Sequence, residues 1–102
     1  MKSDVVKAVF QDELERNGRL ISRYNTELET LPKGSIFKRK IGSQEYLYLN
    51  YREGKKVISK FLGKAEEFNT DELQSQLNRQ KEYKQLLKKL LQEQKELLKA
   101  LK

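Results

Sequence analysis

The sequence of 102 residues contains no His, no Cys and no Trp, and it contains a single Pro. Without His there is no imidazole to act as a general base near neutral pH, and without Cys there is no thiol nucleophile. A structural zinc site is also excluded, because such sites are built from Cys and His. Disulfides cannot stabilise the chain. We therefore expect a protein that is not an enzyme, with no catalytic residues, no metal and no cofactor.

Long hydrophobic runs are also missing. Apolar stretches are as short as Ala8, Val9 and Phe10, which is far below the length of a membrane span or of the core of a signal peptide. We therefore expect no membrane contact and a cytoplasmic location. Hydrophobic residues and charged residues each make up 36% of the chain, so any core must be narrow. The length indicates one domain over residues 1–102.

Positive charge is unevenly distributed along the chain. Residues 1–31 hold five basic and six acidic side chains, residues 32–64 hold nine and two, and residues 65–102 hold eight and seven. The middle third therefore accounts for the whole net charge of +7. A concentrated excess of this kind favours a surface that faces a polyanion. The alternative is that the lysines keep a small sheet soluble and block pairing at its edges.

Residues 3–31 are predicted to form a helix that begins at Ser3. Its apolar and Asn residues follow alternating steps of four and three, which is typical of a heptad seam. These positions are Phe10, Leu14, Asn17, Ile21, Tyr24, Leu28 and Leu31. Asn17 and Gly18 resemble a helix stop, so two helices over 4–16 and 19–30 are the alternative. The seam continues in phase beyond Gly18, which favours one helix.

Residues 35–62 change to the alternating pattern of strands. Three strands are predicted at 35–41, 45–52 and 56–62, joined by short Gly-containing turns into an antiparallel meander. In the second strand, Tyr46, Tyr48 and Arg52 share one face, and Leu47 and Leu49 share the other. A sheet this small needs cover on one face, and only the flanking helices are available to provide it.

A second helix is predicted over residues 70–100, with Asn69 and Glu72 as a capping box. It carries a broad leucine stripe, whose interface residues are Leu86, Leu87, Leu90, Leu91, Leu97 and Leu98. The stripe packs on the first helix in a helical hairpin or coiled coil, forms the seam of a homodimer through the C-terminal helix, or fills the groove of a partner. The predicted fold class is α+β, with a long helix, a three-stranded meander and a long Leu-rich helix.

The candidate binding residues lie on the predicted sheet and combine cations with tyrosines. They are Lys38, Arg39, Lys40, Tyr46, Tyr48, Arg52, Lys55, Lys56 and Lys60. Lysines attract phosphates, tyrosine rings stack on exposed bases, and Arg reads a guanine edge. A three-stranded sheet also fits a major groove. The tyrosines could instead pack beneath a helix, but Arg52 at the end of their row favours the exposed position.

The central third carries distinctive motifs. It contains Leu31-Pro32-Lys33-Gly34-Ser35, the hairpin from Tyr46 to Lys56, and Lys60-Phe61-Leu62-Gly63-Lys64. This pattern resembles a small, poorly characterised bacterial domain family found in phage and mobile-element contexts, with an LPKGS turn and a YxYLxYREGKK hairpin between two helices. It also resembles, loosely, the three-stranded arm-binding domains of tyrosine recombinases. In size and style the chain is similar to anti-CRISPR proteins.

These features lead to three functional hypotheses. The first is a non-enzymatic binding protein whose basic sheet contacts DNA, RNA or the nucleic-acid-binding surface of a nucleoprotein. The second, implied by the phage-like resemblance, is an inhibitor of a host defence nuclease, such as one that blocks the guide RNA or DNA channel of Cas9. The third is a structural coiled-coil adaptor. The ligand, its sequence and the oligomeric state do not follow from the residues.

Overall fold

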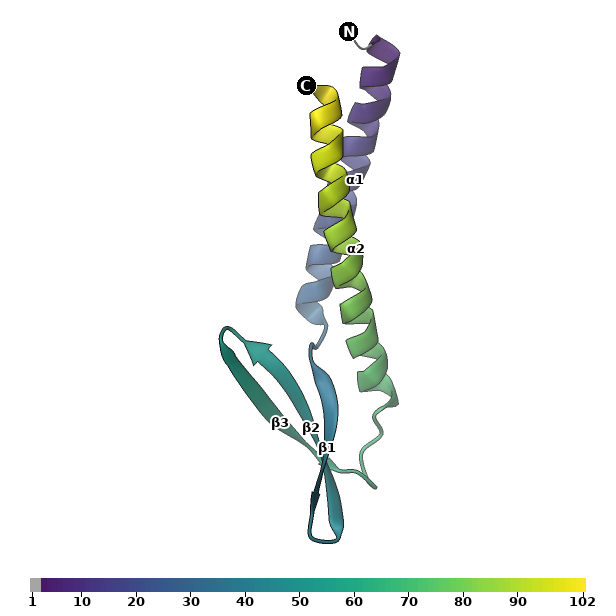
Figure 1. The fold of residues 1–102 in the computed structure, drawn as a ribbon. Helices are drawn as coiled ribbons and strands as arrows, with labels where there is room; N and C mark the ends of the chain where they lie inside the picture. The colour runs from purple at the N-terminus through teal and green to yellow at the C-terminus, as the bar shows by residue number, and fades with distance from the viewer. Residues whose placement is uncertain (1–2) are drawn as a thin grey trace. The chain divides into compact units, whose positions relative to one another are not determined.

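The computed structural model describes residues 3–102 and contains two long helices and one antiparallel sheet (Figure 1). Its elements in chain order are α1 (Asp4–Thr30), β1 (Ser35–Ile41), β2 (Gln44–Glu53), β3 (Lys56–Lys64) and α2 (Asp71–Leu101). The predicted α+β class and the element order are confirmed, and each predicted boundary lies within two residues of the observed one.

The α1 helix is continuous from Asp4 to Thr30, so the prediction of one helix is confirmed and the two-helix alternative is wrong. Ser3 acts as the N-cap, since its Oγ accepts a hydrogen bond of 3.2 Å from the Val6 backbone N–H. Gly18 stays helical because seam positions before and after it are buried or half-buried on the same side of one helix. A break at Gly18 would expose these positions, and that loss outweighs the weak helix preference of Gly.

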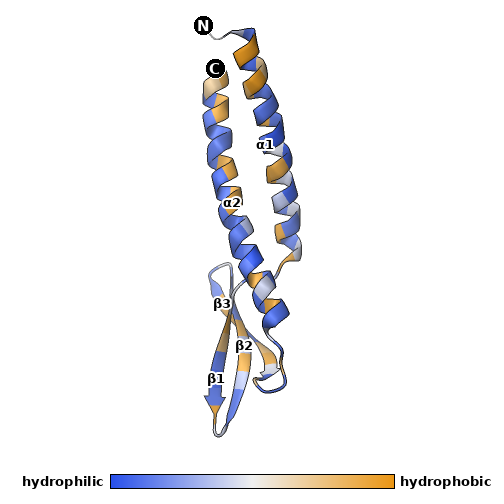
Figure 2. Ribbon diagram, turned by 90° about the vertical axis from the view of Figure 1, so that its right-hand side faces the viewer, coloured by the Kyte–Doolittle hydropathy of each residue, from blue (hydrophilic) through white to orange (hydrophobic). Residues whose placement is uncertain are grey.

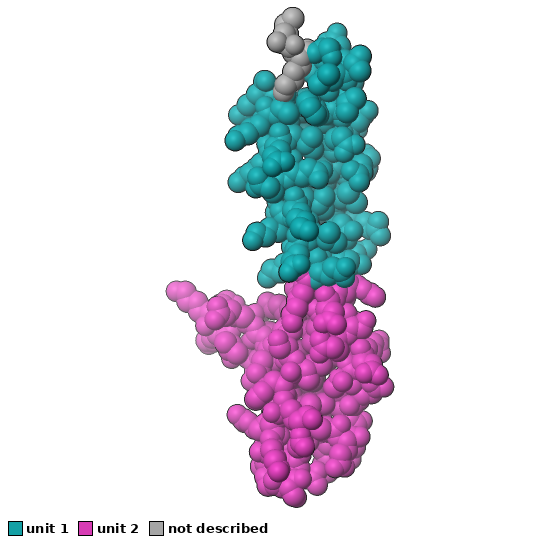
Figure 3. Space-filling view, turned by 45° about the vertical axis from the view of Figure 1, so that its right-hand side comes forward, with its two compact units in different colours: residues 1–30, 82–102 teal, residues 31–81 magenta. Residues whose placement is uncertain are grey.

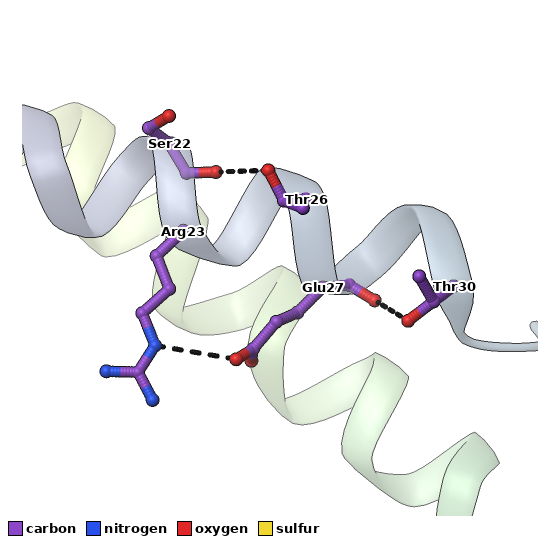
Figure 4. A network of polar contacts seen from close by, with 5 residues as sticks. All are labelled: Ser22, Arg23, Thr26, Glu27 and Thr30. Atoms are coloured by element: carbon purple, nitrogen blue, oxygen red, sulfur yellow. Dashed lines mark hydrogen bonds and ion pairs between the residues drawn. The ribbon is translucent and has the colours of Figure 1, made fainter.

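The C-terminal part of α1 carries several polar contacts between its own residues (Figure 4). The Thr26 hydroxyl donates to the Ser22 carbonyl at 3.0 Å, and the Thr30 hydroxyl donates to the Glu27 carbonyl at 2.8 Å. The Arg23 guanidinium pairs with Glu27 at 3.4 Å. The Thr30 bond satisfies one of the carbonyls that a helix end leaves unpaired, and Pro32 prevents the helix from continuing.

The sheet has the order β1-β2-β3, and both neighbouring pairs are antiparallel. Tight turns at Gly42-Ser43 and Gly54-Lys55 connect the strands, and each turn takes its positive φ at the glycine. The register between β2 and β3 shifts at Leu47 and Tyr48, where a bulge leaves Leu62 without a partner. Phe61 and Gly63 thereby pair with Tyr48 and Leu47.

The chain divides into two compact units (Figure 3). The first unit combines α1 with Glu82–Lys102, so that α1 and the second part of α2 run side by side in opposite directions (Figure 1). A ring contact and a hydrogen bond are among the contacts that join these helices. The Tyr24 and Tyr83 rings lie with centroids 4.9 Å apart, and the Asn17 Nδ2 donates a 2.8 Å hydrogen bond to the Leu90 carbonyl. The helical hairpin is therefore confirmed.

Most seam positions of both helices are half-buried within this unit, and Asn17 is fully buried. Hydrophobic residues recur between hydrophilic ones along both helices (Figure 2). Of the six predicted interface leucines, Leu86, Leu87, Leu90 and Leu97 are half-buried, whereas Leu91 and Leu98 remain 46% and 48% exposed. Within the hairpin the interface therefore uses four of the six leucines.

The second unit, Leu31–Lys81, contains the sheet and the first part of α2. Its core is small and consists of Leu47, Leu49 and the completely buried Leu77. The backbone N–H of Asp71 donates a hydrogen bond of 2.9 Å to the Asn69 side-chain oxygen at the start of α2. This is the Asn69 half of the predicted capping box, and the return bond from Glu72 stays a prediction. Neither helix contains an apolar stretch that could cross a bilayer within the described residues. One domain over 1–102 stays a prediction.

Candidate functional site

Four aromatic side chains share one face of the sheet, and we call this surface the aromatic face. It consists of Phe37 from β1, Tyr46 and Tyr48 from β2, and Phe61 from β3. The strand register places Phe37, Tyr48 and Phe61 side by side across all three strands. Leu47 and Leu49 alternate with the tyrosines and therefore point to the opposite, buried face. The exposed position predicted for Tyr46 and Tyr48 thus agrees with the structure.

The four rings form one connected cluster. The Tyr48 centroid lies 6.1 Å from Phe37 and 5.6 Å from Phe61, and Tyr46 lies 6.1 Å from Phe61. These spacings fall in the range of favourable tilted and edge-on ring pairs. Even so, Phe37 and Phe61 are 38% and 57% exposed, and the tyrosines are only half-buried. The cluster therefore presents its ring surfaces to solvent.

Further exposed apolar residues border the aromatic face. Val57 lies opposite Arg52, and Ile41 lies at the end of β1, so the register places both on the same face as the rings. They are 66% and 53% exposed. Polar and cationic side chains separate them from the rings, so the contiguous apolar area of this face is the ring cluster itself, and such clusters are typical of binding surfaces.

Two arginines belong to the aromatic face. The Arg39 guanidinium lies 5.7 Å from the centroid of the Tyr48 ring, within the distance of a cation–π contact. Arg52 follows Tyr46 and Tyr48 by the alternation of β2. Between these cations, the Ser59 hydroxyl donates a hydrogen bond to the Asn50 side-chain oxygen. The face thus combines rings, guanidinium groups and a polar pair.

The predicted lysines do not join this arrangement. Lys38, Lys40, Lys56 and Lys60 lie on the leucine side of the sheet, because they alternate with or pair opposite residues of that face. Lys38 forms an ion pair of 3.3 Å with Glu45. Lys55 lies in the turn between β2 and β3. Of the nine predicted binding residues, the structure therefore brings together Tyr46, Tyr48, Arg39 and Arg52.

Phe37 and Phe61 were missed as binding residues by the sequence analysis. Phe37 precedes Arg39 by two positions, and Phe61 follows Val57 by four. Strand alternation therefore places Phe37 on the same face as Arg39 and Phe61 on the same face as Val57, but it does not relate one strand to the next. The missing information was the register, which the tight turn at Gly42 and the bulge at Leu62 determine.

The aromatic face consists of rings, guanidinium groups and neutral polar side chains. No group of His, Cys, Asp and Glu side chains that could hold a metal ion occurs among residues 3–102. The strands and their turns, residues 35–64, carry eight basic and two acidic side chains, so the rings lie in a positive environment. Such a surface attracts anions and offers flat apolar area to planar groups.

A comparison with family models identifies the chain. Residues 10–75 match the family described as a domain of unknown function, DUF6788, and because this match covers more than half of the sequence, the protein belongs to that family. The matched region contains most of α1, the whole sheet and the start of α2. No curated protein and no solved structure gives a significant match. The prediction of a poorly characterised family is therefore confirmed.

Proposed function

We propose that this protein binds single-stranded nucleic acid through the aromatic face of its sheet. One observation carries the proposal: four connected, solvent-accessible rings cross all three strands on the face opposite the buried leucines. Arg39 lies over the Tyr48 ring, and Arg52 lies farther along the same face. Unpaired bases stack on such rings, whatever their sequence, because every base has a π surface. Antiparallel sheets with exposed aromatics are a recurrent solution for single strands.

The exposed rings favour single strands over a duplex. In a duplex the base surfaces are already stacked on one another, so the rings of this sheet would find only base edges and phosphates. If the sheet lay in a major groove, Phe37 and Phe61 would contact the polar edges of the base pairs. Those base edges would lose their water and gain no hydrogen bonds in return, which costs free energy. Splayed bases, by contrast, cover the rings and leave phosphates free for Arg39 and Arg52.

The charge of the sheet also bears on the rival hypothesis of a nuclease inhibitor. The nucleic-acid channel of a nuclease is itself basic, so a protein that fills it needs acidic side chains. The sheet carries an excess of basic residues, which supports contact with nucleic acid itself.

A phage or mobile-element origin is a further hypothesis, and the neighbouring genes test it. Recombinase genes would favour the nucleic-acid-binding protein, and defence-inhibitor genes would favour the nuclease inhibitor.

Tyrosine fluorescence offers a direct test, because the chain has five Tyr and no Trp. A single-stranded oligothymidine of ~12 nucleotides should quench the parent. Tyr46→Ala with Tyr48→Ala should weaken binding by at least about 30-fold, since each stacked base is worth about 1–3 kcal/mol and two rings are lost. Tyr46→Phe with Tyr48→Phe keeps the rings and should bind a labelled oligonucleotide like the parent, while the quenching disappears. Thermal melts check that each variant is folded.

A pair of neighbouring cations controls for general electrostatics. Arg39→Gln removes a cation from the aromatic face, whereas Lys40→Gln removes the same charge from the other face. We expect Arg39→Gln to weaken binding several-fold more. The proposal is wrong if both alanine substitutions leave affinity unchanged, or if a duplex of the same length binds more tightly. Capture of a purified RNA-guided nuclease that survives nuclease digestion, with no oligonucleotide binding, would favour the inhibitor instead.

A further inference from the structure

The second part of α2 carries five lysines on one side, and we call this surface the lysine stripe. It consists of Lys84, Lys88, Lys95, Lys99 and Lys102. Four lie within α2 and Lys102 follows its last residue, and all five are exposed. At 3.6 residues per turn, the five positions fall within an arc of about 60° and extend over ~27 Å of the helix axis.

Acidic side chains border the lysine stripe along one edge only. The glutamates of this part of α2 are Glu82, Glu93 and Glu96, which lie about 90–150° from the centre of the stripe, and Glu96 comes three residues before Lys99 at that edge. None of the five lysines forms an ion pair with any residue of the described chain, 3–102. The net charge of residues 65–102 is only +1, because the acidic side chains cancel the lysines in the sum but not on this face.

The lysine stripe faces away from the hairpin interface. Its arc lies roughly opposite Leu86, Leu90 and Leu97, which are half-buried toward α1. Holding five like charges on one side without acidic partners costs free energy through mutual repulsion. A polyanion removes that cost, and the row of ammonium groups matches the repeating charge of a phosphate backbone.

A membrane surface fits this face less well. A helix that lies on anionic lipid needs a broad apolar face to insert beside its lysines. In α2 the broad apolar face packs on α1, and only Leu91 and Leu98 border the stripe as exposed apolar residues. Lysine alone also suits a contact without base specificity, because its ammonium group is a point charge rather than a planar fork.

We propose that the lysine stripe is a second nucleic-acid contact, which binds the phosphate backbone of the strand whose bases stack on the aromatic face. This inference rests on the proposed function of the sheet. It assigns the two surfaces different tasks, since the sheet contacts bases and the stripe contacts only phosphates. Strands long enough to reach both surfaces therefore bind more tightly and with a steeper salt dependence than strands that cover the sheet alone.

The test compares a ~8-nucleotide with a ~30-nucleotide oligothymidine, which bracket the usual site sizes of single-strand binding folds. Lys88→Gln with Lys95→Gln should weaken binding of the long strand about tenfold at ~100 mM salt and lower its salt slope by about 1.4, or ~0.7 per lost phosphate contact. Binding of the short strand should stay within twofold. Glutamine preserves helix propensity.

A matched control separates position from charge. Arg19→Gln with Lys89→Gln removes the same charge from exposed helix positions outside the stripe. This variant should bind both the short and the long oligonucleotide with an affinity within twofold of the parent. If the stripe variant and the Arg19/Lys89 control bind the long strand with equal affinity, the stripe is not a contact. Loss of short-strand binding in Tyr46→Ala with Tyr48→Ala would still support the proposed function of the sheet. If the short strand never binds but the long one depends on the stripe, the sheet proposal fails instead. If Lys88→Gln with Lys95→Gln loses binding to phosphatidylglycerol vesicles but binds both oligonucleotides like the parent, the inference is overturned in favour of a membrane.

Discussion

At the residue scale, Asn17 is the most constrained side chain of the hairpin. It is completely buried, and its Nδ2 donates to the Leu90 carbonyl at 2.8 Å, while its side-chain oxygen has no hydrogen-bond partner. An amide that is only half satisfied stabilises a seam less than a leucine would. Its donor bond, however, is available only when Asn17 lies beside Leu90. We infer that Asn17 fixes the register of α1 against α2 at some cost in stability.

Replacement of Asn17 by an acid tests this interpretation. Asn17→Asp is nearly isosteric, but at neutral pH it removes the donor and buries an unpaired charge, which should lower the free energy of unfolding by about 3 kcal/mol. Burial raises the pKa of the introduced carboxyl above its unfolded value, so the deficit relative to the parent should shrink as the pH falls and the protonated group donates to Leu90. Urea unfolding at neutral and acidic pH measures this difference.

The exposed Asn25 provides the control on the same helix. Asn25→Asp should change the free energy of unfolding by less than about 0.5 kcal/mol, as surface substitutions usually do. The register interpretation is contradicted if Asn17→Asp is as stable at neutral pH as Asn25→Asp.

At the scale of elements, the two faces of α2 have different roles. Leu90 is half-buried toward α1, whereas its neighbour Leu91 is 46% exposed. The hairpin should therefore tolerate charge at one position and not at the other. The sheet shows the same division, with leucines on one face and rings on the other, so α2 and the sheet each leave one face exposed.

Adjacent leucines in α2 test this division. Leu90→Asp should lower the free energy of unfolding by about 3 kcal/mol, because it places a charge in the seam, and Leu91→Asp should lower it by less than ~1 kcal/mol. Thermal melts of the parent and of each variant, at several protein concentrations, measure the two losses of stability. Equal losses, together with a parent melting temperature that rises with concentration, would show instead that Leu91 lies in the seam of a homodimer.

The sequence was sufficient to predict the elements but not how their faces combine. The seam from Phe10 to Leu28 and the alternation in β2 specify one helix and one strand, because period and burial agree along each segment. The neighbours Lys38 and Arg39 share a local charge cluster in the sequence, yet they lie on opposite faces. Joining Phe37, Tyr48 and Phe61 required the register across two turns and a bulge, which is a property of three strands together.

At the scale of the whole molecule, the net charge of +7 is divided between surfaces. Counting along the sequence assigns all of it to the middle third, because the eight basic and seven acidic side chains of residues 65–102 nearly cancel in number. The helical repeat separates them by face and creates the lysine stripe. The charge that a ligand meets therefore depends on the surface it approaches, and both the sheet and the lysine stripe are basic.

The most direct test of the central claim is a residue-by-residue map of binding by nuclear magnetic resonance. A ~8-nucleotide single-stranded oligothymidine is titrated into the labelled protein at ~150 mM salt. The account predicts that the largest shifts occur in the ring signals of Phe37, Tyr46, Tyr48 and Phe61 and in the Arg39 side chain, with Tyr24 and Tyr83 unchanged. Shifts confined to α1 and the leucine face, or no shifts at all, would contradict it.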